Sequence, residues 1–105
     1  MNKLRLTPEA VDDLLQIKAY ISDKLQNPTA AENTVRRITA SLRILTRHAE
    51  AGPSVEAATG CKTDLRFLVC GNYIALYRVD GNTVSVARVF NGRQDYLRLL
   101  FGERE

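Results

Sequence analysis

The sequence predicts an α+β domain in which a strand and an antiparallel helical hairpin precede a three-stranded antiparallel meander and a short C-terminal helix. Three observations support this fold class. Apolar residues recur at helical spacing in the first half of the chain and follow a strand pattern in the second half. Helix-start signals that contain proline occur twice in the first half. Two Gly-Asn pairs divide the second half into strand-length segments.

Length and composition indicate one domain that spans residues 1–105. The chain has 105 residues, of which 45% are hydrophobic and 26% are charged, so its composition is that of a globular protein. No apolar run approaches the ~20 residues of a membrane span. Residues 1–8 also lack the apolar stretch of a signal peptide. We therefore expect a cytoplasmic protein.

The first half predicts one strand and two helices. Leu4 and Leu6 alternate with basic residues, so residues 3–7 form a short strand candidate. Thr7 as N-cap and Pro8 at the first helical position start a helix over residues 8–25. Asn27-Pro28 repeats this signal. The apolar stripe of the second helix consists of Ala31, Val35, Ile38, Leu42 and Leu45. The short link between the helices predicts an antiparallel hairpin.

The second half predicts a loop and then a meander. Residues 48–63 contain Gly52-Pro53 and Gly60 and have little periodicity, so a loop is expected there. Three segments rich in β-branched and aromatic residues follow, at 64–70, 73–79 and 83–90.

The turns between these strands, and the end of the chain, are also predicted. Gly71-Asn72 and Gly81-Asn82, with glycine first, indicate type II′ hairpin turns. Asn91 is expected to cap a final helix that contains Tyr96, Leu97 and Leu100.

Two-residue turns fix which side chains share a face of the sheet. They place Arg66 opposite Tyr77, and Tyr77 opposite Val86. One face then carries Arg66, Leu68, Cys70, Tyr73, Ala75, Tyr77, Val84, Val86, Arg88 and Phe90. The other carries Leu65, Phe67, Val69, Ile74, Leu76, Arg78, Ala87 and Val89. Both faces are apolar, and the helical hairpin covers only one. The final helix or a partner must cover the other, and we favour a partner.

The strand arginines are the candidate polar site. Arg66 and Arg88 fall on the face assigned to the core, where a carboxylate from the first helix, Asp12 or Asp13, would neutralise one of them. We predict a structural ion pair between Asp13 and Arg88. Arg78 and Arg93 are expected at the surface, where they could hold phosphate.

Several catalytic classes have no support in the sequence. Cys61, Cys70 and His48 have no metal-ligand spacing, so we expect free thiols, no metal site and no cofactor. No phosphate-binding glycine loop, carboxylate pair or nucleophile triad is present, and Tyr77 is expected in the core. The formal net charge of +3 fits an acidic partner or a phosphate backbone.

Three segments carry a resemblance to a known family. They are LTPEAVDDL at residues 6–14, GNYIALYRV at residues 71–79 and VARVFNGRQDY at residues 86–96. In this order and spacing the chain resembles the RelE/ParE superfamily of bacterial type II toxin–antitoxin toxins over nearly its whole length. The resemblance implies a RelE/ParE-like fold and a toxin of a type II toxin–antitoxin system.

The resemblance implies one of two activities. RelE-like toxins cleave mRNA in the ribosome with basic residues on the open sheet face and a C-terminal Arg and Tyr, whereas ParE-like toxins act on DNA gyrase. In this chain Leu65, Phe67 and Ile74 occupy the open-face positions, and apolar side chains cannot move a proton. We therefore expect a ParE-like gyrase inhibitor without enzyme activity. Asn91 departs from ParE, because many members have His there.

Two alternatives to the gyrase inhibitor stay open. In a RelE-like mRNA interferase, Arg93 and Tyr96 would be catalytic and Arg78 would clamp phosphate. A degenerate member would bind its partner without toxicity.

The resemblance also implies a partner for the spare apolar face. An acidic cognate antitoxin would wrap around the toxin through Leu65, Phe67, Ile74 and Leu76.

Overall fold

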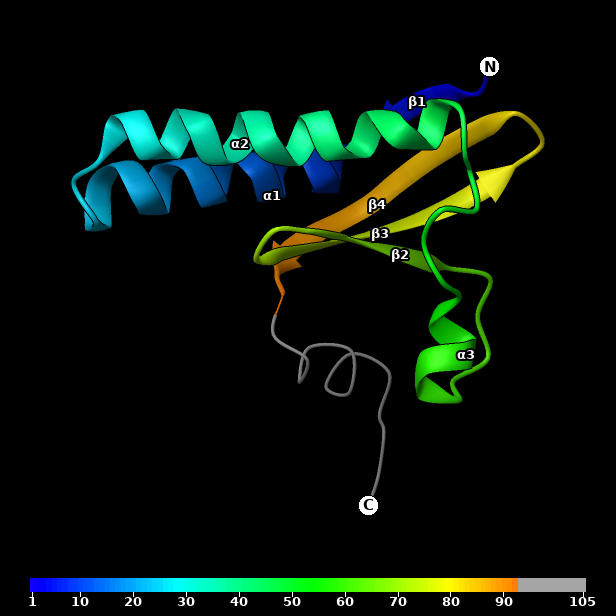
Figure 1. The fold of residues 1–105 in the computed structure, drawn as a ribbon. Helices are drawn as coiled ribbons and strands as arrows, with labels where there is room; N and C mark the ends of the chain where they lie inside the picture. Colours follow the sequence, from blue (N-terminus) through cyan, green and yellow to red (C-terminus); the bar gives the residue numbers. More distant parts are fainter. Residues whose placement is uncertain (93–105) are drawn as a thin grey trace.

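A four-stranded mixed sheet forms the centre of the fold, with helices on both faces. The computed structural model describes residues 1–92. The strands are β1 (Lys3–Leu6), β2 (Arg66–Cys70), β3 (Tyr73–Asp80) and β4 (Thr83–Asn91), in the order β1-β4-β3-β2. Helices α1 and α2 lie on one side of the sheet, and the short helix α3 lies on the other (Figure 1). The predicted final helix, with Tyr96, Leu97 and Leu100, lies outside the described residues.

The sheet differs from the predicted three-stranded meander because β1 joins it. Lys3–Leu6 pairs in parallel with residues 83–86 of β4, which makes the sheet mixed. The alternation of Leu4 and Leu6 predicted the strand, but a sequence pattern does not name a partner so distant in the chain. The antiparallel order of β2, β3 and β4 follows the prediction.

The helical hairpin begins at the two predicted caps. The Thr7 hydroxyl accepts a hydrogen bond from the Ala10 N–H, and the Asn27 side chain accepts one from the Ala30 N–H. The first helix consists of α1 (Pro8–Ala19) and a π-helical turn (Tyr20–Lys24). The second consists of α2 (Pro28–Leu42) and a 3₁₀ turn (Arg43–Thr46). No helix among residues 1–92 is long and apolar enough to cross a membrane.

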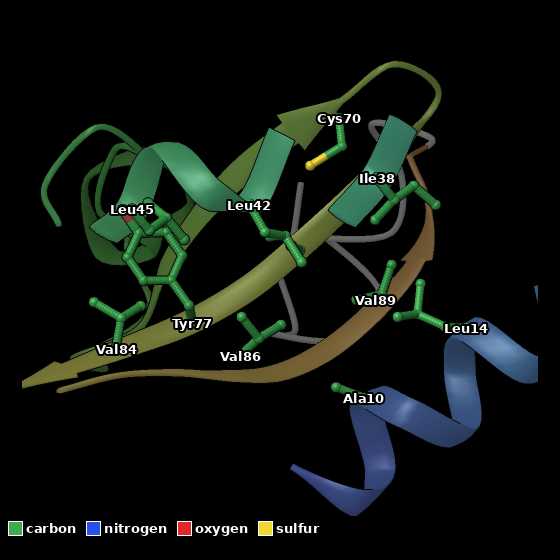
Figure 2. Close-up of a cluster of buried hydrophobic side chains, with 11 residues drawn as sticks. Ala10, Leu14, Ile38, Leu42, Leu45, Cys70, Tyr77, Val84, Val86 and Val89 are labelled. Carbon is green, nitrogen blue, oxygen red and sulfur yellow. The ribbon is translucent and has the colours of Figure 1, made fainter. Parts of the chain in front are cut away.

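The main core lies between the hairpin and the sheet. Figure 2 shows side chains from both helices and from β2, β3 and β4 converging there. Tyr77 is the largest of the wholly buried side chains. Its fully buried ring agrees with the expectation that it belongs to the core. The buried members of this cluster are Ala10, Leu14, Ile38, Leu42, Leu45, Cys70, Ala75, Tyr77, Val84, Val86 and Val89.

A β-bulge in β4 corrects the predicted division of the sheet faces. Tyr77 pairs with Val86 as predicted, but Leu76 pairs with Arg88, so Ala87 is an extra residue. Beyond the bulge the side chains change face. Val89 therefore joins the main core, whereas Phe90 packs on the opposite side of the sheet.

A short helix interrupts the segment that was predicted to be a loop. Helix α3 (Val55–Thr59) begins at Ser54, whose hydroxyl accepts a hydrogen bond from the Ala57 N–H. It ends at Gly60, which has a left-handed conformation with φ 79°. One apolar residue, Val55, is buried from this helix, and so small a helix leaves no periodic pattern in the sequence.

Candidate interaction surface

The sheet face opposite the hairpin carries the side chains that were predicted to bind an antitoxin. Helix α3 covers part of this face, because Val55 packs on Leu76 and both are buried. Ile74 is also buried, whereas Leu65 and Phe67 are only partly buried at the margin of the Val55–Leu76 cluster. The chain itself therefore covers two of the four predicted positions and leaves Leu65 and Phe67 accessible.

Among residues 1–92, the outer edge of β2 is paired over its first residues and has no backbone partner at Val69. Segment 53–55 lies along this edge, since the Phe67 N–H donates to the Pro53 carbonyl at 3.0 Å and the Val55 N–H donates to the Leu65 carbonyl at 2.9 Å. The register with β3 directs the N–H and C=O of Val69 to the same outer side. Its side chain is 62% exposed. Leu65, Phe67 and Val69 thus form an apolar strip beside a short free strand edge.

Loop 50–53, which leads into α3, is fixed by polar groups that were not foreseen. The Arg66 Nε donates to the Gly52 carbonyl at 2.7 Å, and its Nη2 donates to the Glu50 carbonyl at 3.4 Å. The Gly52 N–H donates to the Tyr77 hydroxyl at 2.9 Å. The Arg66 guanidinium is therefore held by backbone carbonyls and not by a helix carboxylate. Since loop carbonyls carry no sequence signature, these partners could not be read from the chain.

Arg78, the predicted phosphate-binding residue, forms an ion pair with Asp64. Its Nε lies 3.0 Å from both carboxylate oxygens of Asp64. The side chains are 49% and 68% exposed respectively, so the pair is solvated. The hydrogen bond from Arg78 holds the pKa of Asp64 below its ordinary value, and the same bond raises the pKa of Arg78. An incoming phosphate would have to compete with this carboxylate.

This ion pair gives a pH-dependent prediction. We expect the Asp64 carboxyl to titrate below 3.8 in the folded chain, because Arg78 favours its charged form. The stabilisation is therefore present above the unfolded pKa and is lost as the pH falls through the folded pKa. Carboxyl carbon chemical shifts measured by NMR against pH test this directly. In Arg78→Gln the Asp64 pKa should rise toward its ordinary value, and an unchanged pKa would contradict the pairing.

Asp13 lies where α1 meets the free edge of β4. Its carboxylate accepts hydrogen bonds from Arg88 Nε at 2.8 Å, from Arg88 Nη2 at 3.0 Å and from the Val89 N–H at 2.9 Å. The Asp13 side chain is 12% exposed and that of Arg88 is 52% exposed. Asp13 and Arg88 are thus in contact, at the edge of the sheet and not within its core. Asp13 holds the backbone just beyond the bulge.

The remaining concave surface contains few reactive groups. A cleft of about 580 Å³ lies between α2 and the β2–β3 turn and is lined in part by Arg37, Ser41, Cys70 and Tyr73. Burial raises the pKa of the Cys70 thiol, which keeps it protonated and unreactive. Among residues 1–92 no cluster of His, Cys, Asp or Glu could hold a metal ion. Arg93 and Tyr96, the candidate nuclease residues, lie outside the described residues.

Comparisons with known proteins were made for the sequence and for the fold. A family model described as "ParE toxin of type II toxin-antitoxin system, parDE" matches residues 4–96. The fold is similar to a structure of the chromosomal ParDE system from P. aeruginosa, with a TM-score of 0.74 and 23% identity, covering 89% of this chain and 98% of that chain.

A second solved structure has a more distant similarity. It is the RelBE2 toxin–antitoxin complex from Mycobacterium tuberculosis, with a TM-score of 0.50 and 20% identity, covering 86% of this chain and 90% of that chain. No curated protein matches the sequence.

Proposed function

The chain belongs to the ParE toxin family of type II toxin–antitoxin systems, and from this membership we propose that it arrests growth by binding DNA gyrase in the cytoplasm. In this proposal the toxin acts by protein contact and not by catalysis. A cognate antitoxin binds the toxin and silences it.

The observation that carries the proposal is the chemistry of the sheet face opposite the hairpin. A ribonuclease needs side chains that shift protons and stabilise a charged phosphorane. Leu65 and Phe67 are apolar, Ile74 is buried and Arg78 is occupied by Asp64. These positions suit contact with another protein better than hydrolysis of RNA.

The proposed antitoxin contact uses the apolar strip of Leu65, Phe67 and Val69. An extended segment of the antitoxin would cover these side chains and hydrogen-bond the free backbone groups of Val69. Because the toxin has a formal net charge of +3, an acidic segment would also gain favourable long-range attraction. The buried Leu76 would take part only if Val55 of α3 moved away from it, and Ile74 is buried as well.

The test is to induce this chain alone in a bacterium while thymidine and methionine incorporation are followed together. The proposal predicts that DNA synthesis falls first, because gyrase is required for replication. The purified chain should also inhibit DNA supercoiling by gyrase in the absence of ribosomes. Arg93→Ala serves as a matched variant, and its toxicity should be retained.

Three outcomes would contradict the proposal. If protein synthesis falls first and Arg93→Ala abolishes the effect, the chain is an mRNA interferase with Arg93, Tyr96 and Arg78 at its site. If neither synthesis falls, the chain is a binding module without toxicity in that host. If growth stops but purified gyrase is not inhibited, the target is another protein.

A further inference from the structure

The exposed side of α2 and its 3₁₀ continuation carries a row of arginines that the proposed antitoxin contact does not use. Arg36 and Arg43 are spaced by seven residues, which places them along one side of the α-helix, and Arg47 follows at the end of the 3₁₀ turn. All three are exposed, and Arg37 flanks them. The opposite side of the helix buries Ala31, Ile38, Leu42 and Leu45. We call Arg36, Arg37, Arg43 and Arg47 the arginine row.

Within the described residues, no carboxylate pairs with the charges of this row. The two ion pairs among residues 1–92 involve Arg78 and Arg88, which lie in the sheet. Arg36 Nη1 donates a hydrogen bond to the Asn33 side-chain oxygen at 3.0 Å, and this neutral partner leaves the positive charge uncompensated. These guanidinium groups are therefore available to an anionic partner.

The row also accounts for the basic character of the whole protein. Residues 28–48 contain four arginines and one glutamate, and this excess equals the formal net charge of +3 of the entire chain. The remaining residues balance acids against bases. A positive field that comes from one helix attracts anions to that helix.

The residues between the arginines indicate which anion fits. Asn33, Ala40 and Ile44 lie among them. No Phe, Tyr or Trp occurs in residues 28–48, so the face lacks the large stacking platforms on which single-stranded nucleic acid binds. Ile44 is its one large exposed aliphatic side chain, so the face also lacks the apolar centre typical of a protein interface. The planar guanidinium group of arginine forms paired hydrogen bonds with phosphate, so phosphate is the anion that this face fits.

The dimensions fit the backbone of a duplex. From Arg36 to Arg47 the row extends ~18 Å, with a rise of ~1.5 Å per residue in the α-helix and ~2 Å in the 3₁₀ turn. The phosphates of one strand advance ~3.4 Å per nucleotide along the duplex axis, so the length of the row corresponds to about five such steps. The convex side of a helix fits the wide major groove of B-DNA, whereas the major groove of duplex RNA is too narrow.

We propose that the arginine row of α2 binds the phosphate backbone of duplex DNA without reading its sequence. This contact lies beyond the proposed gyrase function and does not rest on it. It would give the toxin a second surface that keeps it on DNA.

The test measures binding of the full chain to a fluorescein-labelled 24-base-pair DNA duplex by fluorescence anisotropy between 50 and 200 mM NaCl. The triple variant R36Q/R43Q/R47Q should bind more than tenfold more weakly at low salt. The slope of log affinity against log salt should fall by about 2.7, since each phosphate contact contributes ~0.9. Because all three side chains are exposed, the circular dichroism spectrum should be unchanged.

The matched control is K3Q/K18Q/K24Q, which removes the same number of exposed positive charges from other elements. It should retain most of the affinity and the salt slope. Equal losses in both triple variants would show a general charge effect and overturn the proposal. Equal binding to a 24-base-pair RNA duplex, or displacement of DNA by polyglutamate at matched charge, would also overturn it. If the chain binds DNA but does not inhibit gyrase, the proposed gyrase function is refuted and the DNA-binding proposal is retained.

Discussion

Replacing Gly52 by alanine is expected to destabilise the fold by about 3 to 5 kcal/mol, as overpacking and lost hydrogen bonds combine. A Cβ at position 52 would lie 2.0 Å from the Phe67 carbonyl oxygen and 3.0 Å from the Tyr77 hydroxyl. Both neighbours are fixed, because one is backbone and the other belongs to a fully buried ring. The φ angle of Gly52 lies outside the left-handed region, so backbone strain adds nothing to the clash.

Movement of loop 50–53 to relieve the clash would carry a further cost. It would separate the Gly52 N–H from the Tyr77 hydroxyl and the Gly52 carbonyl from Arg66. A buried polar group without a partner costs ~1–3 kcal/mol. The attachment of α3 to the sheet depends on the same loop.

Thermal unfolding of the purified chain measures this effect. A loss of 3 kcal/mol corresponds to a fall in Tm of at least ~12 °C for a domain of about this size. Ala51→Ser, which adds one atom at the exposed neighbouring position, should leave Tm within 2 °C as the control. A Tm for Gly52→Ala within 4 °C of the parent would show that loop 50–53 accommodates the added Cβ at little cost, and it would contradict the prediction.

Replacing Asp13 by alanine is expected to cost about 2 to 3 kcal/mol, because a nearly buried acceptor of three hydrogen bonds is removed. The bonds to the half-exposed Arg88 contribute the smaller part, since water and salt screen that pair. Loss of the acceptor for the Val89 N–H contributes the larger part. Val89 belongs to the main core, so its backbone cannot move freely toward water.

Asp12→Ala provides a matched control on the adjacent residue. It changes the net charge equally, but Asp12 is exposed and its hydrogen bond is with the exposed side chain of Gln16. Chemical unfolding should show little change for Asp12→Ala and a clear loss for Asp13→Ala. Asp13→Asn should fall between the wild type and Asp13→Ala, because an amide oxygen can still accept from Val89. Equal stabilities of the two alanine variants would refute this role for Asp13.

Much of the fold could be predicted from the sequence because its signals are local. Thr7 and Asn27 satisfy orphan N–H groups within three residues, and Gly71 and Gly81 have the positive φ that a type II′ turn requires. Once these turns are set, the register of β2 with β3 follows.

The errors arose where the determinant is distant or small. The β4 bulge interrupts the strict alternation of side chains, and the three-residue step from Val86 to Val89 is its trace in the sequence. Because both faces of the sheet are apolar, the sequence pattern fits β4 equally well with or without the bulge. The pairing of β1 with β4 joins opposite ends of the chain.

The candidate site was predicted less completely than the fold. Apolar alternation found Leu65 and Phe67, but it could not show that α3 buries Leu76 or that Asp64 pairs with Arg78. These contacts come from an irregular segment, whose side chains meet the sheet only after the chain has folded back. The sequence did not predict the roles of Gly52 and Arg66. Their contacts are made with backbone atoms, which every residue has and which therefore leave no pattern in a sequence.

The parallel pairing of β1 with β4 has a consequence for synthesis of the protein. Lys3–Leu6 is made first, but its strand partner is residues 83–86. At ~5–20 residues per second, the ribosome needs about 4 to 16 s to make the intervening chain. During that time the amphipathic hairpin has no sheet to cover. The nascent chain therefore completes its native fold only after β4 has emerged from the ribosome.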